Sequence, residues 1–359
     1  MNPQFWRGKK VFLTGHTGFK GSWLSLWLHR LGAQVFGVSL APSSDQPSLF
    51  KLCDVQDSLQ ESQFLDIRDG ASLQSALQQA QPDIVLHLAA QALVRESYRS
   101  PVTTFETNVL GTVNVLEAVR RAPAIKVCIN VTTDKCYENQ EWIWGYREVD
   151  RLGGADPYSA SKACSELVTS AYRSSFFSTS NCAAIATARA GNVIGGGDWS
   201  TDRLIPDIVR AATRGETLTI RSPTAVRPWQ HVLDPLHGYL MLAEKLATHA
   251  AGMDSAWNFG PALTAQKSVE AILETFKQQF SPDLMWKIDT TDQPHETQTL
   301  RIDSTKARSL LAWQPRLAVD DSLQWTASWY KRWSETPKLM RDFTLSQIEK
   351  FESLSTASE

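Results

Sequence analysis

Short apolar runs alternate with amphipathic segments through the first half of the chain. Short apolar runs bounded by turn residues are typical of buried strands, and apolar residues at helical spacing indicate helices. Strands that alternate with helices predict an α/β fold with a doubly wound parallel sheet. The expected strands are 9–14, 34–39, 62–67, 84–91, 126–131 and 183–188, and the clearest expected helices are 22–31, 104–121 and 157–177.

The pattern becomes irregular and rich in glycine after Ala190. We interpret 1–189 as a domain built on the sheet, and 190–348 as a smaller, mostly irregular or helical lobe that covers a substrate. A later segment, about 228–260, is expected to return to the first domain. The polar residues 349–359 are expected to form a flexible tail.

Composition and charge narrow the classes of partner. The 359 residues are 42% hydrophobic, which suits a large core, and the net charge of -2 provides no basic surface for nucleic acid or an anionic membrane. The start of the chain lacks the apolar core of a signal peptide, and no apolar run is long enough to span a bilayer. The five cysteines are scattered without a C-x-x-C pair, so we expect neither disulfides nor a metal site. These features predict a cytoplasmic protein.

Glycines mark the turn between the first strand and the first long helix. Gly15, Gly18 and Gly21 form G-x-x-G-x-x-G. Such a turn lets the backbone approach a pyrophosphate at a helix N-terminus, which predicts dinucleotide binding in a Rossmann-type sheet, although an ordinary tight turn would share the pattern. We assign Thr17 and Phe19, in the same turn, to the cofactor site.

The second expected strand ends at Ser39, and its end bears on cofactor choice. An acidic residue there would bind the adenosine ribose of NAD, whereas a nearby Arg would suit the 2′-phosphate of NADP. Neither is present. We expect NAD, with NADP still open, and we interpret Lys20 as a solvated side chain rather than a phosphate contact.

Further cofactor contacts are expected after the next strands. Asp66 could bind the adenine amino group beside Ile67, or it could cap the helix that starts near Ser72. Ala89 and Ala90 are small enough for a ribose to lie against the backbone.

Tyr158 and Lys162 are spaced four apart in a helix that Pro157 opens. They would therefore share one helix face. An ammonium next to a phenol lowers the phenol's pKa, so the pair could act as a general base while the lysine also reaches a ribose hydroxyl. The alternative is an exposed pair on a helix surface.

Thr133, Asp134 and Lys135 directly follow an expected strand. The carboxyl ends of parallel strands are where such sheets bind ligands, so a hydroxyl, a carboxylate and an amine are predicted at the site. In isolation the Asp-Lys pair could simply close a surface turn. We interpret the neighbouring Cys136 as structural.

Taken together, these motifs resemble the extended short-chain dehydrogenase/reductase superfamily over nearly the whole chain. Within it, nucleotide-sugar 4,6-dehydratases carry an acid and a base after the threonine, and the base is usually Glu. Asp134-Lys135 resembles the branch that acts on a CDP-linked hexose. Further motifs that share this resemblance are Trp-Ile-Trp-Gly-Tyr-Arg-Glu at 142–148, Gly-Gly-Gly-Asp-Trp at 195–199 and Arg-Pro-Trp-Gln-His at 227–231.

The resemblance implies a reaction. Tyr158 would remove the C4 hydroxyl proton, with Thr133 hydrogen-bonded to the same oxygen. Lys135 would remove the C5 proton and Asp134 would protonate the leaving C6 hydroxyl, giving a 4-keto-6-deoxy sugar nucleotide for deoxysugar biosynthesis. A lysine acts as a base only when neutral, and an ordinary lysine has a pKa of about 10.4, so this role requires burial or a nearby cation.

Substrate contacts are expected mainly in the second lobe. Arg227 and Arg203 could bind the diphosphate, Asn192 is a polar residue at the junction of the lobes, and Gln91 follows the fourth strand. His295 could contact the edge of the substrate or could simply be a polar loop residue.

Other functions share parts of this pattern. The chain could be a 4,6-dehydratase or 4-epimerase for a GDP-, UDP- or dTDP-linked sugar, or a non-catalytic regulator that responds to a dinucleotide. The resemblance also implies a homodimer or homotetramer, paired through the helices at 104–121 and 157–177.

Overall fold

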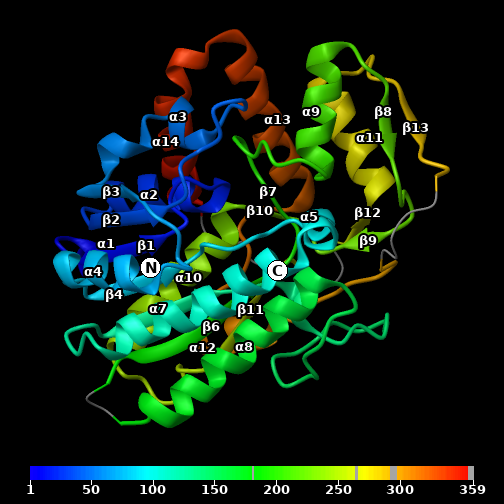
Figure 1. Cartoon of the computed structure of the whole chain (residues 1–359). Coiled ribbons are helices and arrows are strands. Elements are labelled where there is room, and N and C mark those ends of the chain that lie inside the picture. The colour runs from blue at the N-terminus through cyan, green and yellow to red at the C-terminus, as the bar shows by residue number, and fades with distance from the viewer. Residues whose placement is uncertain (180–181, 263–265, 292–296, 355–359) are drawn as a thin grey trace.

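Seven parallel strands form the central sheet, in the order β11-β6-β5-β4-β1-β2-β3 (Figure 1). The computed structural model describes residues 1–179, 182–262, 266–291 and 297–354. The strands are β1 Lys10–Thr14, β2 Gln34–Ser39, β3 Glu61–Phe64, β4 Ile84–His87, β5 Val127–Val131, β6 Ala184–Ala190 and β11 Ala256–Phe259. The order reverses direction between β1 and β4, so the predicted doubly wound sheet is confirmed.

Alternate residues of the strands enter two separate cores. In β1, Val11 and Leu13 face one core, whereas Phe12 faces the other. Both faces are buried, which explains why these strands read as continuous apolar runs. Trp23 and Trp27, four apart on α2, are fully buried in the first core.

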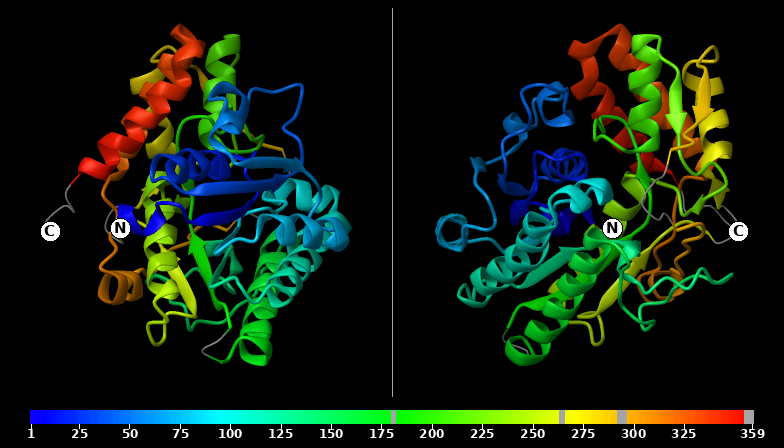
Figure 2. Two further views of the ribbon diagram at one scale, coloured as in Figure 1. Left: turned by 90° about the vertical axis from the view of Figure 1, so that its left-hand side faces the viewer. Right: turned by 45° about the vertical axis from the view of Figure 1, so that its right-hand side comes forward.

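Helices cover both faces of the sheet. One face carries α2 Phe19–Arg30 and α10 Leu233–Ala247, and α14 Met340–Ser353 packs against α2. The other carries α4 Gly70–Ala80, α7 Gly111–Arg120 and α8 Pro157–Phe176, of which α7 and α8 lie side by side (Figure 2).

A second group of elements lies beyond the carboxyl ends of the strands. It contains α9 Leu204–Arg214, α11 Val269–Phe280 and α13 Val319–Glu335, with β8 Leu218–Ile220 paired to β13 Trp286–Ile288. Two short strand pairs connect it to the sheet, β7 Val193–Ile194 with β10 Gln230–His231 and β9 Val226–Arg227 with β12 Lys267–Ser268. The remaining short elements are α1 Pro3–Trp6, α3 Leu49–Leu52, η1 Val55–Ser58, α5 Val94–Arg99, α6 Pro101–Phe105, η2 Glu106–Leu110, η3 Asp134–Cys136, α12 Thr305–Leu311 and η5 Pro337–Leu339.

Two sequence predictions need correction. The expected helix 104–121 is interrupted by the π-helical turn η2, so α7 starts only at Gly111. The expected flexible tail from 349 is wrong at its start, because α14 continues to Ser353. Phe351 is fully buried there, and Glu352 accepts hydrogen bonds from Trp27 and Arg30. Residues 355–359 lie outside the described part of the chain.

The division into domains stays a prediction. The segment 228–260 contains α10, which packs against β5 and β6, and β11, the outer strand of the sheet. Within the described ranges, none of the helices is both long and apolar enough to cross a membrane.

Candidate active site

A cleft of about 1320 Å³ lies at the carboxyl ends of β1, β4, β5 and β6. It continues between the sheet and the group of elements that contains α9 and β8. Every residue that the sequence assigned to catalysis, cofactor or substrate lines this cleft. The sequence therefore predicted which side chains would gather, although the role of each remains a prediction.

The glycine turn is shaped for close backbone approach. Gly15 has a φ of 82°, and a Cβ there would lie 2.8 Å from the backbone nitrogen of Ala89. A Cβ on Gly21 would lie 2.0 Å from the carbonyl oxygen of Gly15. A side chain at Gly15 would clash with the segment that follows β4, and one at Gly21 would push α2 away from the turn. The N-terminus of α2, at Phe19, lines the cleft. This cradle fits the pyrophosphate of a dinucleotide.

Hydrogen bonds hold this half of the cleft in place. The Thr17 hydroxyl bonds to Ser39 Oγ at 2.8 Å and donates to the Leu40 carbonyl at 2.9 Å. Thr17 thus connects the glycine turn to the end of β2, where the ribose of a dinucleotide would lie.

Asp66 is not a helix cap. The cap of α4 is Asp69, whose side chain accepts from the backbone nitrogen of Ser72 at 3.1 Å. Asp66 instead pairs with Arg68 at 2.6 Å, and the hydrogen bond from Arg68 lowers the pKa of the Asp66 carboxyl. The role of Asp66 as a helix cap is therefore excluded, and its contact with the adenine amino group stays a prediction.

Lys20 differs from its sequence interpretation. Its side chain lines the cleft, and the residue is half-buried. Burial and the charge of Arg203 lower the pKa of Lys20 to about 7, against the opposing charge of Asp134. The interpretation as a solvated side chain is therefore wrong.

Helix α8 presents Tyr158 and Lys162 to the cleft. Asp156 caps the helix by accepting from the backbone nitrogen of Ser159 at 2.9 Å. The expected lowering of the Tyr158 pKa is not found: burial raises it to about 12, against a hydrogen bond with Thr133. Burial lowers the pKa of Lys162 to about 8, and its Nζ donates to the Val131 carbonyl at 3.2 Å.

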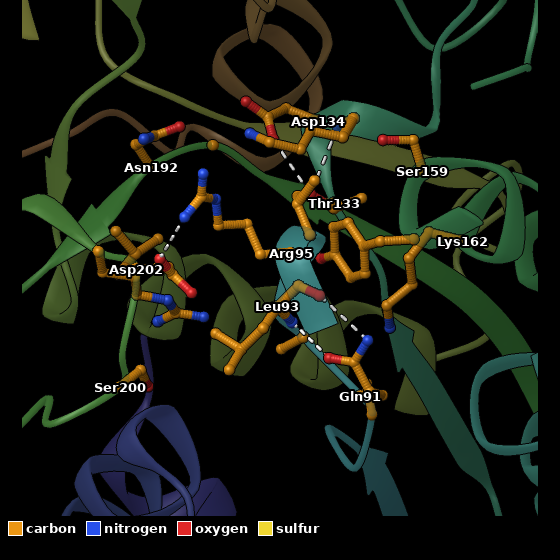
Figure 3. Close-up of a pocket in the computed structure, with 18 of the residues that line it drawn as sticks. Gln91, Leu93, Arg95, Thr133, Asp134, Ser159, Lys162, Asn192, Ser200 and Asp202 are labelled. Atoms are coloured by element: carbon orange, nitrogen blue, oxygen red, sulfur yellow. Dashed lines mark hydrogen bonds and ion pairs between the residues drawn. The ribbon is translucent and has the colours of Figure 1, made fainter. Parts of the chain in front are cut away.

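Thr133, Asp134 and Lys135 form a short turn at the end of β5. The Thr133 hydroxyl donates to Asp134 Oδ1 at 3.0 Å and accepts from the Lys135 backbone nitrogen at 3.3 Å (Figure 3). Lys135 Nζ lies 3.9 Å from Asp134 Oδ1, with 28% of the lysine side chain exposed. Asp134 is buried, and no group in the described ranges bonds to its Oδ2. A hydroxyl, a carboxylate and an amine therefore converge beside Tyr158.

The predicted substrate contacts divide into two kinds. Asn192 has a buried Oδ1 with no partner among the described residues, and Arg203 pairs with Asp198 at 2.9 Å.

Gln91 bonds to the backbone of Leu93 and to Thr104, and the Arg227 guanidinium donates to the carbonyls of 226, 297 and 298. These two residues hold the cleft wall in place. His295 lies outside the described residues.

An ion-paired group that the sequence did not reveal lines the same cleft. Asp202 pairs with Arg95 at 3.4 Å and with Arg221 at 3.4 Å, joining α5 to the β8 side of the cleft (Figure 3). Their separation along the chain left no local signal, so only the fold brings them together.

Comparison with known proteins agrees with this geometry. The family described as GDP-mannose 4,6 dehydratase matches residues 12–326. The chain is 48% identical over 338 residues to the CDP-glucose 4,6-dehydratase of Salmonella typhimurium strain LT2, with 93% of each chain covered. A dTDP-glucose 4,6-dehydratase from Bacillus anthracis, solved in complex with NAD, aligns with a TM-score of 0.75 at 22% identity, covering 90% of this chain and 97% of that one. A UDP-glucose-4-epimerase from Stenotrophomonas maltophila aligns with a TM-score of 0.79 at 21% identity, covering 91% and 99%.

The sheet order, the glycine turn and the Tyr158–Lys162 pair define a short-chain dehydrogenase/reductase. Within that class, the chain belongs to the GDP-mannose 4,6 dehydratase family. The resemblance found in the sequence is therefore confirmed.

Proposed function

We propose that this chain dehydrates CDP-D-glucose to CDP-4-keto-6-deoxy-D-glucose with NAD, as a step in deoxysugar biosynthesis of the lipopolysaccharide type. The observation that carries the proposal is the Asp134–Lys135 pair beside Thr133 and Tyr158. An epimerase needs no acid and base at this point, whereas elimination of water needs both. The 48% identity to a CDP-glucose 4,6-dehydratase supports the choice of CDP-glucose.

Each polar side chain at the end of β5 and on α8 has its own role in the proposed reaction. Tyr158 removes the C4 hydroxyl proton, and Thr133 hydrogen-bonds to the same oxygen. NAD, when bound at the glycine turn, supplies the chemistry of hydride acceptance from C4 and return to C6. The C4 ketone acidifies C5–H, so Lys135 can remove that proton while Asp134 protonates the departing C6 hydroxyl.

Asp134 and Lys135 lie beside each other, with 3.9 Å between Lys135 Nζ and Asp134 Oδ1. Transfer of one proton from the lysine to the carboxylate would give the neutral base and the acid that elimination requires. After elimination, Lys135 holds the proton from C5 and Asp134 has given its proton to water. The pair is then back in its ionic form, so no proton need be exchanged with solvent.

Substrate contacts follow from charge and position. Arg203 is the cation that we assign to the diphosphate, since it lines the cleft at the start of α9. Asn192 offers a side-chain oxygen at the same wall that has no partner within the described ranges. Gln91 and Arg227 support the wall through their bonds to backbone groups.

We also infer a homodimer or homotetramer. Exposed apolar side chains lie on the helices α6, η2 and α8, which pack together, namely Val102, Phe105, Leu110 and Leu167. A second copy of the same face would remove them from water.

The function is tested by incubating the protein and NAD with CDP-, UDP-, GDP- and dTDP-glucose. A 4-keto product, measured by its absorbance in alkali, is expected from CDP-glucose. Product from a different nucleotide alone would contradict the substrate. A C4-inverted sugar would identify an epimerase, and no reaction with any of them would favour a regulator.

A further inference from the structure

A buried ion pair lies behind the cleft. Glu166 on α8 and Arg189 on β6 are 2.8 Å apart, and each side chain is only 3% exposed. Neither lines the cleft. Removing one partner of a buried ion pair is strongly destabilising, but the intact pair adds little stability compared with apolar side chains in its place. Stability alone therefore does not explain the pair, and its contacts indicate its role.

The pair contacts both ends of one turn, residues 132–137. At the start, the Thr132 hydroxyl donates to Glu166 Oε1. At the end, Arg189 Nη1 donates to the Tyr137 hydroxyl at 2.8 Å, and the guanidinium lies 5.0 Å from the centre of the Tyr137 ring. Tyr137 in turn donates to Asn258 at 2.7 Å. Thr133, Asp134 and Lys135 lie between these two anchored ends.

Helix α8 places its contacts in register with the same turn. Tyr158, Lys162 and Glu166 follow one another at intervals of four, so they share one helix face. Lys162 Nζ donates to the Val131 carbonyl, Glu166 accepts from the Thr132 hydroxyl, and Tyr158 lines the cleft with Thr133. One face of α8 thus holds the consecutive residues Val131 and Thr132 at the end of β5, and Arg189 bonds the far end of the turn to the same Glu166.

We propose that Glu166 and Arg189 are positioning residues that clamp the 132–137 turn and hold Thr133, Asp134 and Lys135 in place. The inference rests on the proposed function for the identity of the reacting groups. The clamp acts through Thr132 and Tyr137 and does not touch substrate. Errors of about 1 Å in such groups can lower a rate by about a hundredfold, so fixing the turn would have a direct effect on turnover.

The test removes single hydroxyls and keeps both charges. Thr132→Val cuts the bond between the pair and the turn. Thr187→Val is the matched control, because its equally buried hydroxyl donates to the other oxygen of Glu166 at 2.7 Å from β6, outside the turn. We expect Thr132→Val to lower kcat about tenfold to a hundredfold with little change in KM, and Thr132→Ser to recover most of the loss. Thr187→Val is expected to retain kcat within about twofold at a similar loss of stability.

A second measurement does not depend on turnover. Hydrogen–deuterium exchange of the 132–137 amides is expected to accelerate in Thr132→Val and Tyr137→Phe, but not in Thr187→Val. Unchanged kcat in Thr132→Val, or an equal loss in Thr187→Val, would overturn the clamp while leaving the dehydratase intact. If the wild-type protein makes no product, the proposed function fails, and unchanged exchange in Thr132→Val would overturn the clamp separately.

Discussion

The burial and the hydrogen bonds of the Asp134 carboxylate indicate its role. One carboxylate oxygen is held by the Thr133 hydroxyl, and the other has no bond within the described ranges. A buried polar atom without a partner is costly, so it is best explained by a group that arrives with the substrate. The proposed acid role gives it that partner, the C6 hydroxyl.

Replacing Asp134 with Asn tests this role directly. Asn preserves the shape of the side chain but cannot supply an acidic proton, so we expect turnover to fall by about a hundredfold or more. Oxidation at C4 should remain visible as absorbance of the reduced cofactor, because it depends on Tyr158. Asp320→Asn, at a carboxylate with 65% of its side chain exposed, serves as the control with normal turnover. Normal turnover in Asp134→Asn would disprove the assignment.

Helix α10 carries another buried carboxylate, remote from the proposed chemistry. Asp234 lies in its first turn and is fully buried. Its Oδ1 accepts from the backbone nitrogen of Arg316 at 2.7 Å. Burial raises the pKa of Asp234 to about 7 from an ordinary 3.8, although the hydrogen bonds and the charge of Arg316 oppose this. The folded state thus keeps a proton that the unfolded chain releases.

This buried proton predicts a pH dependence of stability. Between pH 3.8 and about 7 the folded state binds more protons than the unfolded state, so the free energy of unfolding falls as pH rises through that window. The fall from this group is about 1.4 kcal/mol per pH unit. Asp234→Asn removes it, and urea unfolding at pH 5 and pH 8 should show the variant gaining stability relative to wild type at pH 8. An equal difference at both values would contradict the prediction.

The spacing of apolar residues predicted most helices and strands, because the pattern of each one lies within a single segment of the chain. The strand from Val127 to Val131 is buried at every position, so its apolar run was clear. The π-helical turn at η2 gave no such signal, since hydrogen-bond register inside a helix is not visible in apolar spacing. The helix around Phe351 was missed because its burial depends on contacts with α2, more than 300 residues earlier in the chain.

The residues of the site also divide into those with a local sequence pattern and those that only the fold brings together. Tyr158 and Lys162 were found by their spacing on one helix, whereas Arg189 reaches Glu166 and Tyr137 only through the folding of β6 beside β5. Roles that depend on such distant pairs had no sequence pattern to reveal them. The motifs therefore predicted the groups that gather in the cleft, but not the buried pair bonded to the turn behind them.

The surface formed by η2 and α8 has exposed apolar side chains. Leu167 on α8 is 58% exposed and Leu110 in η2 is 56% exposed, and these two elements pack together. Isolated exposed leucines are ordinary, but neighbouring ones on adjacent helices are typical of an interface. The face lies on the opposite side of α8 from Tyr158, which points into the cleft, so pairing of two chains would leave each cleft open.

Leu167→Glu tests the assembly. A carboxylate within the proposed symmetric interface would bring like charges from the two chains together and remove apolar burial, so we expect the dissociation constant to rise by about a hundredfold or more. Sedimentation velocity over a range of concentrations should show wild-type protein as a dimer or tetramer and the variant shifted to a smaller species. Leu310→Glu on α12, at 54% exposure, is the matched control that should keep the wild-type mass. A monomeric wild type, or an unchanged mass in Leu167→Glu, would show that this face is not the interface.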